Sequence, residues 1–202
     1  MVPGAAIILG GLGYLRFFAM QNLLNLFLIC VFPLQTWTIY MTFWDVEWVA
    51  ERTTFGDAIG FIGYDLLFAL IECLIAWVFL LLLNLLIPRQ WDRQIRFPLL
   101  GSIILVISIW AFLGQLYFLT GQHVPELFSK FAIATGHPLW VLYGIMIASI
   151  TASIAIPMFL FVKYPKVRER VMAVFERIIV LSGIYLVLDL FGIAIVIYRN
   201  LL

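Results

Sequence analysis

The sequence predicts an all-α fold, a polytopic integral membrane helix bundle with about five transmembrane helices. Of its 202 residues, 65% are hydrophobic and only 11% are charged, whereas ordinary soluble domains are about 45–50% apolar and about 25% charged. Five apolar stretches are long enough to cross a bilayer, which takes about 20 such residues. The polar linkers between them are short, so we expect a single transmembrane domain over residues 1–202.

The expected spans follow one another along the whole chain. They cover about residues 17–43, 59–87, 97–120, 138–162 and 172–198. The first span is longer than a crossing requires and contains Pro33, so we expect it to be tilted or kinked. The glycine-rich stretch 2–13 is too short to cross, and we interpret it as an interfacial or re-entrant piece.

Two linkers carry a pattern of their own. After the first span, Trp44 and Trp48 alternate with acidic side chains, which is typical of a short helix lying on the membrane surface. After the fourth span, a new helix is expected to begin at Pro165, with its charged side chains in the headgroup zone. The remaining linkers are 88–96 and 121–137.

Positive charge sets the expected orientation. It is concentrated in linker 88–96 and around 163–171, and the positive-inside rule places both linkers in the cytoplasm. The residues of the second cluster that we expect to determine topology, or else to bind anionic lipid, are Lys163, Lys166, Arg168 and Arg170. The amino terminus is then cytoplasmic and the carboxyl terminus lies outside, in a plasma membrane of bacterial type.

Three acidic residues lie inside expected spans, where an ionisable side chain is by default a functional hypothesis. Asp65 and Glu72 are seven residues apart in the second span, so they lie on nearly the same helix face. Asp189 lies near the middle of the fifth span. No Lys or Arg falls in the core of a span, so we expect the acids to be neutral hydrogen-bond donors at least part of the time.

These acids have three interpretations. They could form a proton or cation path, they could hydrogen-bond across helices and lock the bundle, or they could face another subunit. The lock is favoured, because acids in membrane spans are rare and usually face inward, and the spans contain suitable partners. These partners are Asn22, Asn25, Gln35, Tyr64, Asn84, Gln115, Ser182 and Tyr185.

A stripe of small residues marks the fourth span. Gly144, Ala148 and Ala152 recur every four residues, a spacing that permits close approach of two helices. The stripe predicts a tight helix contact, either within the chain or with a partner.

The sequence offers no catalytic residue and no metal site. It contains no nucleophile motif, phosphate-binding loop or zinc-ligand spacing. Cys30 and Cys73 lie in apolar runs and are expected to be buried, whereas His123 and His137 lie in one linker. A net charge of +1 gives no indication of nucleic-acid binding. The sequence does not identify a cofactor, a bound pigment or a bound lipid.

The small extramembrane linkers favour a non-catalytic multi-pass subunit that helps assemble or stabilise a larger membrane protein complex, in contact with the lipid bilayer and with other membrane subunits. One alternative is a small proton- or ion-coupled transporter or channel that uses the intramembrane acids. A second alternative is a membrane-anchor module for an external catalytic domain.

Overall fold

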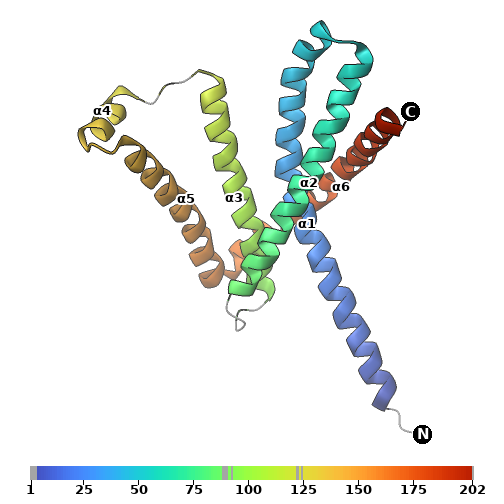
Figure 1. The fold of residues 1–202 in the computed structure, drawn as a ribbon. Coiled ribbons are helices and arrows are strands. Elements are labelled where there is room, and N and C mark those ends of the chain that lie inside the picture. Colours follow the sequence, from blue (N-terminus) through green and yellow to red (C-terminus); the bar gives the residue numbers. More distant parts are fainter. Residues whose placement is uncertain (1–3, 88–90, 92, 122, 124, 202) are drawn as a thin grey trace. The chain divides into compact units, whose positions relative to one another are not determined.

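The expected all-α membrane fold is confirmed. The structure, a computed structural model, describes residues 4–87, 91, 93–121, 123 and 125–201, with the backbone alone for 4–20 and 93. Its described part has six helices, which are α1 (Gly4–Arg52), α2 (Phe55–Leu86), α3 (Arg93–Leu119), α4 (Glu126–Ala134), α5 (Pro138–Lys163) and α6 (Pro165–Leu201) (Figure 1). All except α4 are long and apolar enough to cross a membrane. The chain is therefore an integral membrane protein with five candidate spans.

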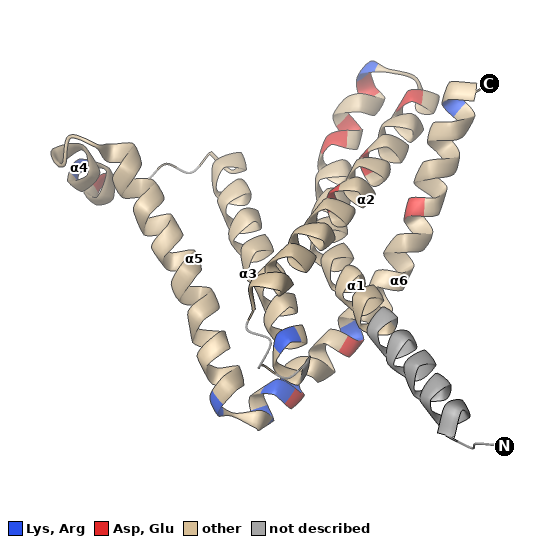
Figure 2. Ribbon diagram, turned by 60° about the horizontal axis from the view of Figure 1, so that its bottom comes forward, with Lys and Arg blue, Asp and Glu red and all other residues tan. Residues whose placement is uncertain are grey.

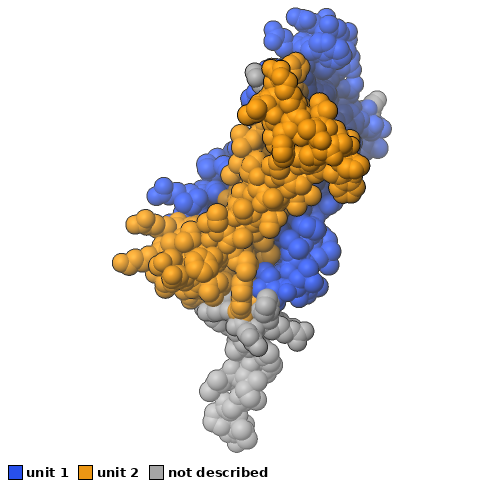
Figure 3. All heavy atoms as spheres, turned by 90° about the vertical axis from the view of Figure 1, so that its left-hand side faces the viewer, with its two compact units in different colours: residues 1–89, 173–202 blue, residues 90–172 orange. Residues whose placement is uncertain are grey.

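The chain divides into two compact units. Unit 1 consists of Met1–Arg89 and Ala173–Leu202, and unit 2 consists of Gln90–Met172 (Figure 3). Unit 1 therefore contains α1, α2 and most of α6, whereas unit 2 contains α3, α4, α5 and the start of α6. The prediction of a single domain stays a prediction, because two compact units of helices can belong to one domain.

Helix α1 is longer than the sequence suggested. It runs without a break from Gly4 to Arg52, so residues 4–13 and the expected first span form one helix. The expected separate surface helix at Trp44 and Trp48 is wrong, because this segment continues α1. No proline follows Pro33 within α1, so nothing in the backbone chemistry ends the helix earlier.

A capping box separates α1 from α2. The Thr54 hydroxyl accepts a hydrogen bond from the backbone N–H of Asp57, and the Asp57 carboxylate accepts one from the N–H of Thr54. This reciprocal pair satisfies N–H groups that have no partner within a helix. It starts α2 at Phe55 and leaves only two residues between α1 and α2.

Unit 2 shows one unexpected element. Linker 121–137 contains the short helix α4, which packs against α5. Helix α5 begins at Pro138, with His137 at its N-cap position, and α6 begins at Pro165 as expected. The indole N–H of Trp110 on α3 donates to the Ser153 hydroxyl on α5 at 3.2 Å, so α3 and α5 are joined by a side-chain hydrogen bond as well as by packing.

The core of unit 1 lies where α1, α2 and α6 meet. Ile29, Cys30 and Cys73 are fully buried. Gly63 of α2 and Gly192 of α6 cross closely, since a Cβ on Gly192 would lie 3.2 Å from the Gly63 carbonyl oxygen. The absence of side chains at both positions lets the two backbones approach, which is the usual basis of tight helix packing in membranes.

Candidate functional site

A buried polar contact in unit 1 joins α1 to α6. Gln35 is 0% exposed and Asp189 is 2% exposed. The Gln35 amide Nε2 donates a hydrogen bond to Asp189 Oδ1 at 2.5 Å. Gln35 is one of the partners that the sequence offered for the intramembrane acids. The bond links residues 154 positions apart in the sequence, so it holds the last span against the first.

Further polar contacts follow the same α1–α6 seam. The buried Ser182 hydroxyl lies 2.6 Å from the Leu28 carbonyl oxygen of α1 and 2.8 Å from the Ile178 carbonyl oxygen of its own helix, and the two oxygens share its single donor. Thr36 and Tyr185 share a hydrogen bond between their hydroxyl oxygens at 3.1 Å. The seam is therefore polar over about two helical turns of α6, in a bundle whose side chains are otherwise mainly apolar.

A second acid, Asp65, also contacts α1. Its Oδ2 accepts a hydrogen bond from the Thr42 hydroxyl at 2.7 Å, and the pair is part-buried. Thr42 was not among the expected partners. Its signal in the sequence is weak, because a threonine in an apolar run commonly bonds its own helix backbone.

Glu72 lies apart from the other two acids. Its side chain is exposed near the middle of α2, whereas its neighbour Cys73 is buried. Within the described part of the chain, no hydrogen bond joins Asp65, Glu72 and Asp189 to one another. Within unit 1 the structure places two of the acids against α1 and exposes the third, so unit 1 does not assemble the three into a continuous path.

The basic residues gather where α5 ends and α6 begins (Figure 2). Lys163, Lys166 and Arg170 are exposed, and Arg168 is half-buried. The Lys163 ammonium lies 5.5 Å from the ring centres of Phe159 and Tyr164, within the range of a cation–π contact. Among the described residues these four basic side chains form no ion pair, so their charges are available to headgroups or to solvent.

The small-residue stripe on α5 is open. Gly144, Ala148 and Ala152 are exposed, and a Cβ on Gly144 would meet nothing within 4 Å. The stripe makes no tight contact within the described part of unit 2, so the predicted helix contact stays a prediction.

The close helix crossing of the chain itself occurs between α2 and α6. The sequence signal for it is the series Gly56, Gly60 and Gly63 at spacings of four and three residues. This series was not among the predicted packing residues, although it has the spacing that brings small residues onto one helix face.

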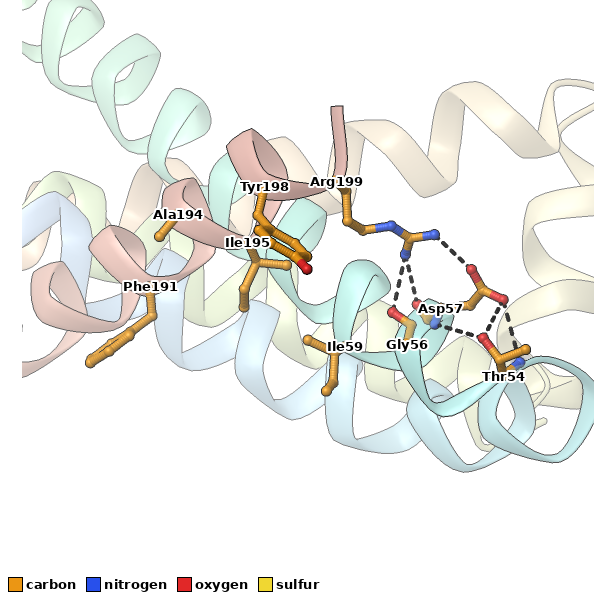
Figure 4. A pocket seen from close by; sticks show the side chains of 9 residues that line it. All are labelled: Thr54, Gly56, Asp57, Ile59, Phe191, Ala194, Ile195, Tyr198 and Arg199. Carbon is orange, nitrogen blue, oxygen red and sulfur yellow. Dashed lines mark hydrogen bonds and ion pairs between the residues drawn. The ribbon is translucent and has the colours of Figure 1, made fainter. Parts of the chain in front are cut away.

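A groove lies beside this glycine series, between the beginning of α2 and the end of α6. It has a volume of about 640 Å³ and an apolar floor that includes Ile59, Phe191 and Ile195 (Figure 4). At its rim, Arg199 Nη2 lies 2.6 Å from Asp57 Oδ1 and the guanidinium also reaches the Gly56 carbonyl. None of the sequence-predicted site residues lines this groove.

The remaining candidates are the cysteines and the histidines, and among the described residues they form no metal-binding group. Cys30 and Cys73 are free thiols and both are buried, as expected. Among the residues that the structure describes, no three His, Cys, Asp or Glu side chains are grouped to hold a metal ion. His137 has no side-chain capping bond, and the backbone carbonyl of His123 accepts a hydrogen bond from the Tyr117 hydroxyl.

Comparison with known proteins adds no relative. No protein-family model, no curated protein and no solved structure matches the chain.

Proposed function

We propose that the chain is a non-catalytic multi-pass subunit that helps to assemble or stabilise a larger membrane protein complex. The observation that carries this proposal is the exposed side chain of Glu72 in the middle of α2. An ionisable group in a bilayer costs several kcal/mol, and such groups usually face a bundle interior or a polar partner. A polar side chain of a neighbouring subunit would supply that partner.

Helix α5 supports the same proposal. All of its residues are described, and Phe161 alone is buried. Its uncovered face includes the stripe of Gly144, Ala148 and Ala152, whose small side chains would let a second helix approach closely. Lipid can cover an apolar helix face equally well, so the stripe supports a partner only together with Glu72.

The proposed orientation follows from the basic residues. With the α5–α6 junction in the cytoplasm, the amino terminus is also cytoplasmic and the carboxyl terminus lies outside a bacterial-type plasma membrane. Arg199, a positive residue near the outer end of α6, is compatible with this orientation because it is paired with Asp57.

Co-purification from mild detergent tests the role of Glu72. We expect Glu72→Leu to retain the fold and to lose the other membrane subunits that travel with the wild-type chain, since leucine removes the polar contact and is favourable in lipid. Glu51→Leu is the control, because Glu51 is an exposed acid at the end of α1. Isolation of the wild-type chain as a homo-oligomer without other subunits would contradict the proposal.

A second pair of variants tests the stripe. A Cβ at Gly144 meets nothing within 4 Å, so we expect Gly144→Leu to leave the fold undisturbed. It should nevertheless weaken a close helix contact with a partner. Gly183→Leu is the matched control, because Gly183 is also an exposed helix glycine with open space at its Cβ, but has Ile179 and Val187 at the four-residue spacings.

One observation favours a second candidate, a proton-coupled transporter. Asp189 is buried beside α1 in the membrane-spanning part of unit 1, where acids often serve proton transfer. Purified protein in liposomes should then carry protons under an imposed potential, and Asp189→Asn should abolish the flux. Absence of flux from the wild-type protein would remove this candidate.

A further inference from the structure

Two buried oxygen atoms in the α1–α6 seam lack a donor. Gln35 Oε1 and Asp189 Oδ2 have essentially no solvent-accessible surface, and neither has a hydrogen-bond partner among the described residues. Buried polar atoms in native structures are nearly always bonded, because burying one without a partner costs the full desolvation penalty. Because the two atoms belong to side chains that are already hydrogen-bonded to each other, one explanation should account for both.

The chemistry of the two groups supplies that explanation. Gln35 donates through Nε2 to Asp189 Oδ1, so the atom left without a partner on each planar group is an oxygen. An ionised carboxylate can only accept, whereas a protonated carboxyl carries one O–H donor. A proton on Oδ2 would turn two unpartnered acceptors into one hydrogen bond.

We propose that Asp189 and Gln35 form a proton-binding site, in which the neutral Asp189 carboxyl donates from Oδ2 to Gln35 Oε1 while the Gln35 amide donates from Nε2 to Oδ1. The two side chains are then joined by a closed ring of two hydrogen bonds. The ligand is a single proton, and the site ties α6 to α1. This inference goes beyond the proposed function and does not depend on it.

The surroundings of Asp189 fit a proton better than an ion. Within the described chain, no Lys or Arg pairs with Asp189, and an unpaired carboxylate at 2% exposure is strongly disfavoured. The titratable side chains near it are the buried thiols of Cys73 on α2 and Cys30 on α1, together with Tyr185 one turn earlier on α6, whose hydroxyl bonds Thr36. A metal cation would need more oxygen ligands than the two that are available.

The site makes the folding equilibrium depend on pH. If the folded chain holds this proton and the unfolded chain releases it to water, the folded state binds one more proton than the unfolded state. The free energy of unfolding then falls as pH rises, and the unfolding equilibrium constant increases about tenfold per pH unit over the range in which the difference persists.

Infrared difference spectroscopy of the full-length protein in detergent tests the position of the proton. At neutral pH, Asp189→Asn should remove a carbonyl-stretch band of a neutral carboxylic acid, a band that shifts in heavy water. Asp65→Asn is the control and should leave this particular band in place. If Asp189→Asn instead removes carboxylate bands, or removes none, the proposal is wrong.

A second variant keeps the test decisive if Asp189→Asn does not fold. Gln35→Met retains the acid and removes its acceptor, so the acid band should move to the frequency of a weakly bonded carboxyl. A band unchanged in position would overturn the proposed ring.

The pH dependence of unfolding provides an independent readout. The free energy of unfolding should fall more steeply with rising pH for the wild-type protein than for Asp189→Asn, by the amount that corresponds to one proton released on unfolding. Equal pH dependences would overturn the proposal.

A comparison of salts tests whether the site binds a cation instead. Sodium chloride and choline chloride at equal ionic strength should give the same stability. If sodium stabilises the wild-type protein but not Asp189→Asn, the site binds a cation and the proton assignment is wrong.

Discussion

The glycine crossing between α2 and α6 allows the strongest quantitative prediction. In Gly192→Ala, the new methyl carbon would lie 2.8 Å from Leu66 Cβ and 3.2 Å from the Gly63 carbonyl oxygen. Carbon atoms pack at about 3.5–4.0 Å, so the helices must separate by at least about 0.7 Å on this simple measure. Overpacking of this kind costs about 1–3 kcal/mol.

Gly183→Ala on the same helix is the matched control. A methyl group there meets nothing within 4 Å, so this variant changes helix propensity without changing the packing of the chain. The propensity gain of alanine over glycine, about 1 kcal/mol in water, applies to both variants and is largely cancelled when they are compared. The difference between them should therefore be the packing cost of about 1–3 kcal/mol.

Reversible unfolding in mixed detergent micelles measures this difference. We expect Gly192→Ala to unfold at a lower fraction of denaturing detergent than Gly183→Ala. If the two variants are equally stable, or if Gly192→Ala is the more stable, then the close approach of α2 and α6 is wrong.

Three further predictions concern other contacts. A double-mutant cycle with Gln35→Leu and Asp189→Leu should give a coupling free energy between about 0.6 kcal/mol, the average measured for hydrogen bonds between membrane helices, and about 1.7 kcal/mol, the largest value; zero coupling would show that the two side chains do not interact. In Gly60→Ala the three atoms nearest the new methyl all belong to the flexible Arg199 side chain, so unfolding should show a smaller loss of stability than for Gly192→Ala and one close to that of Arg199→Gln. A reporter fused to the carboxyl terminus should lie outside the cell, and replacement of Lys163, Lys166, Arg168 and Arg170 by glutamine should yield mixed orientations; a cytoplasmic wild-type reporter would contradict the assigned orientation.

The number and type of spans could be predicted because apolar length is a local property. Residues 138–162 coincide almost completely with α5, and Pro165 begins α6. The ends of α1 were harder to predict, because helix continuation depends on the absence of a breaking signal. The glycine-rich stretch 2–13 was predicted to be a separate piece because it is too short to cross a bilayer, yet glycine weakens a helix without ending it, and residues 4–13 continue into α1.

The contacts between helices could be predicted only in part. Gln35 was one of eight candidate partners for the acids, and nothing in one sequence ranks those eight, since the choice depends on how each helix is rotated. Glu72 shows the same limit. Its spacing from Asp65 placed both on nearly one face, but the structure buries Asp65 in part and exposes Glu72, because a helix face turns gradually out of contact along its length.

Photo-crosslinking in the native membrane tests the proposed subunit role most directly. A photoreactive amino acid would replace Glu72 or Ala148, with Gly183 as the control position, and the products would be identified by mass spectrometry. The proposed role requires the first two positions to form adducts with another membrane protein and requires Gly183 to form adducts with lipid alone. Lipid adducts at all three positions would contradict it.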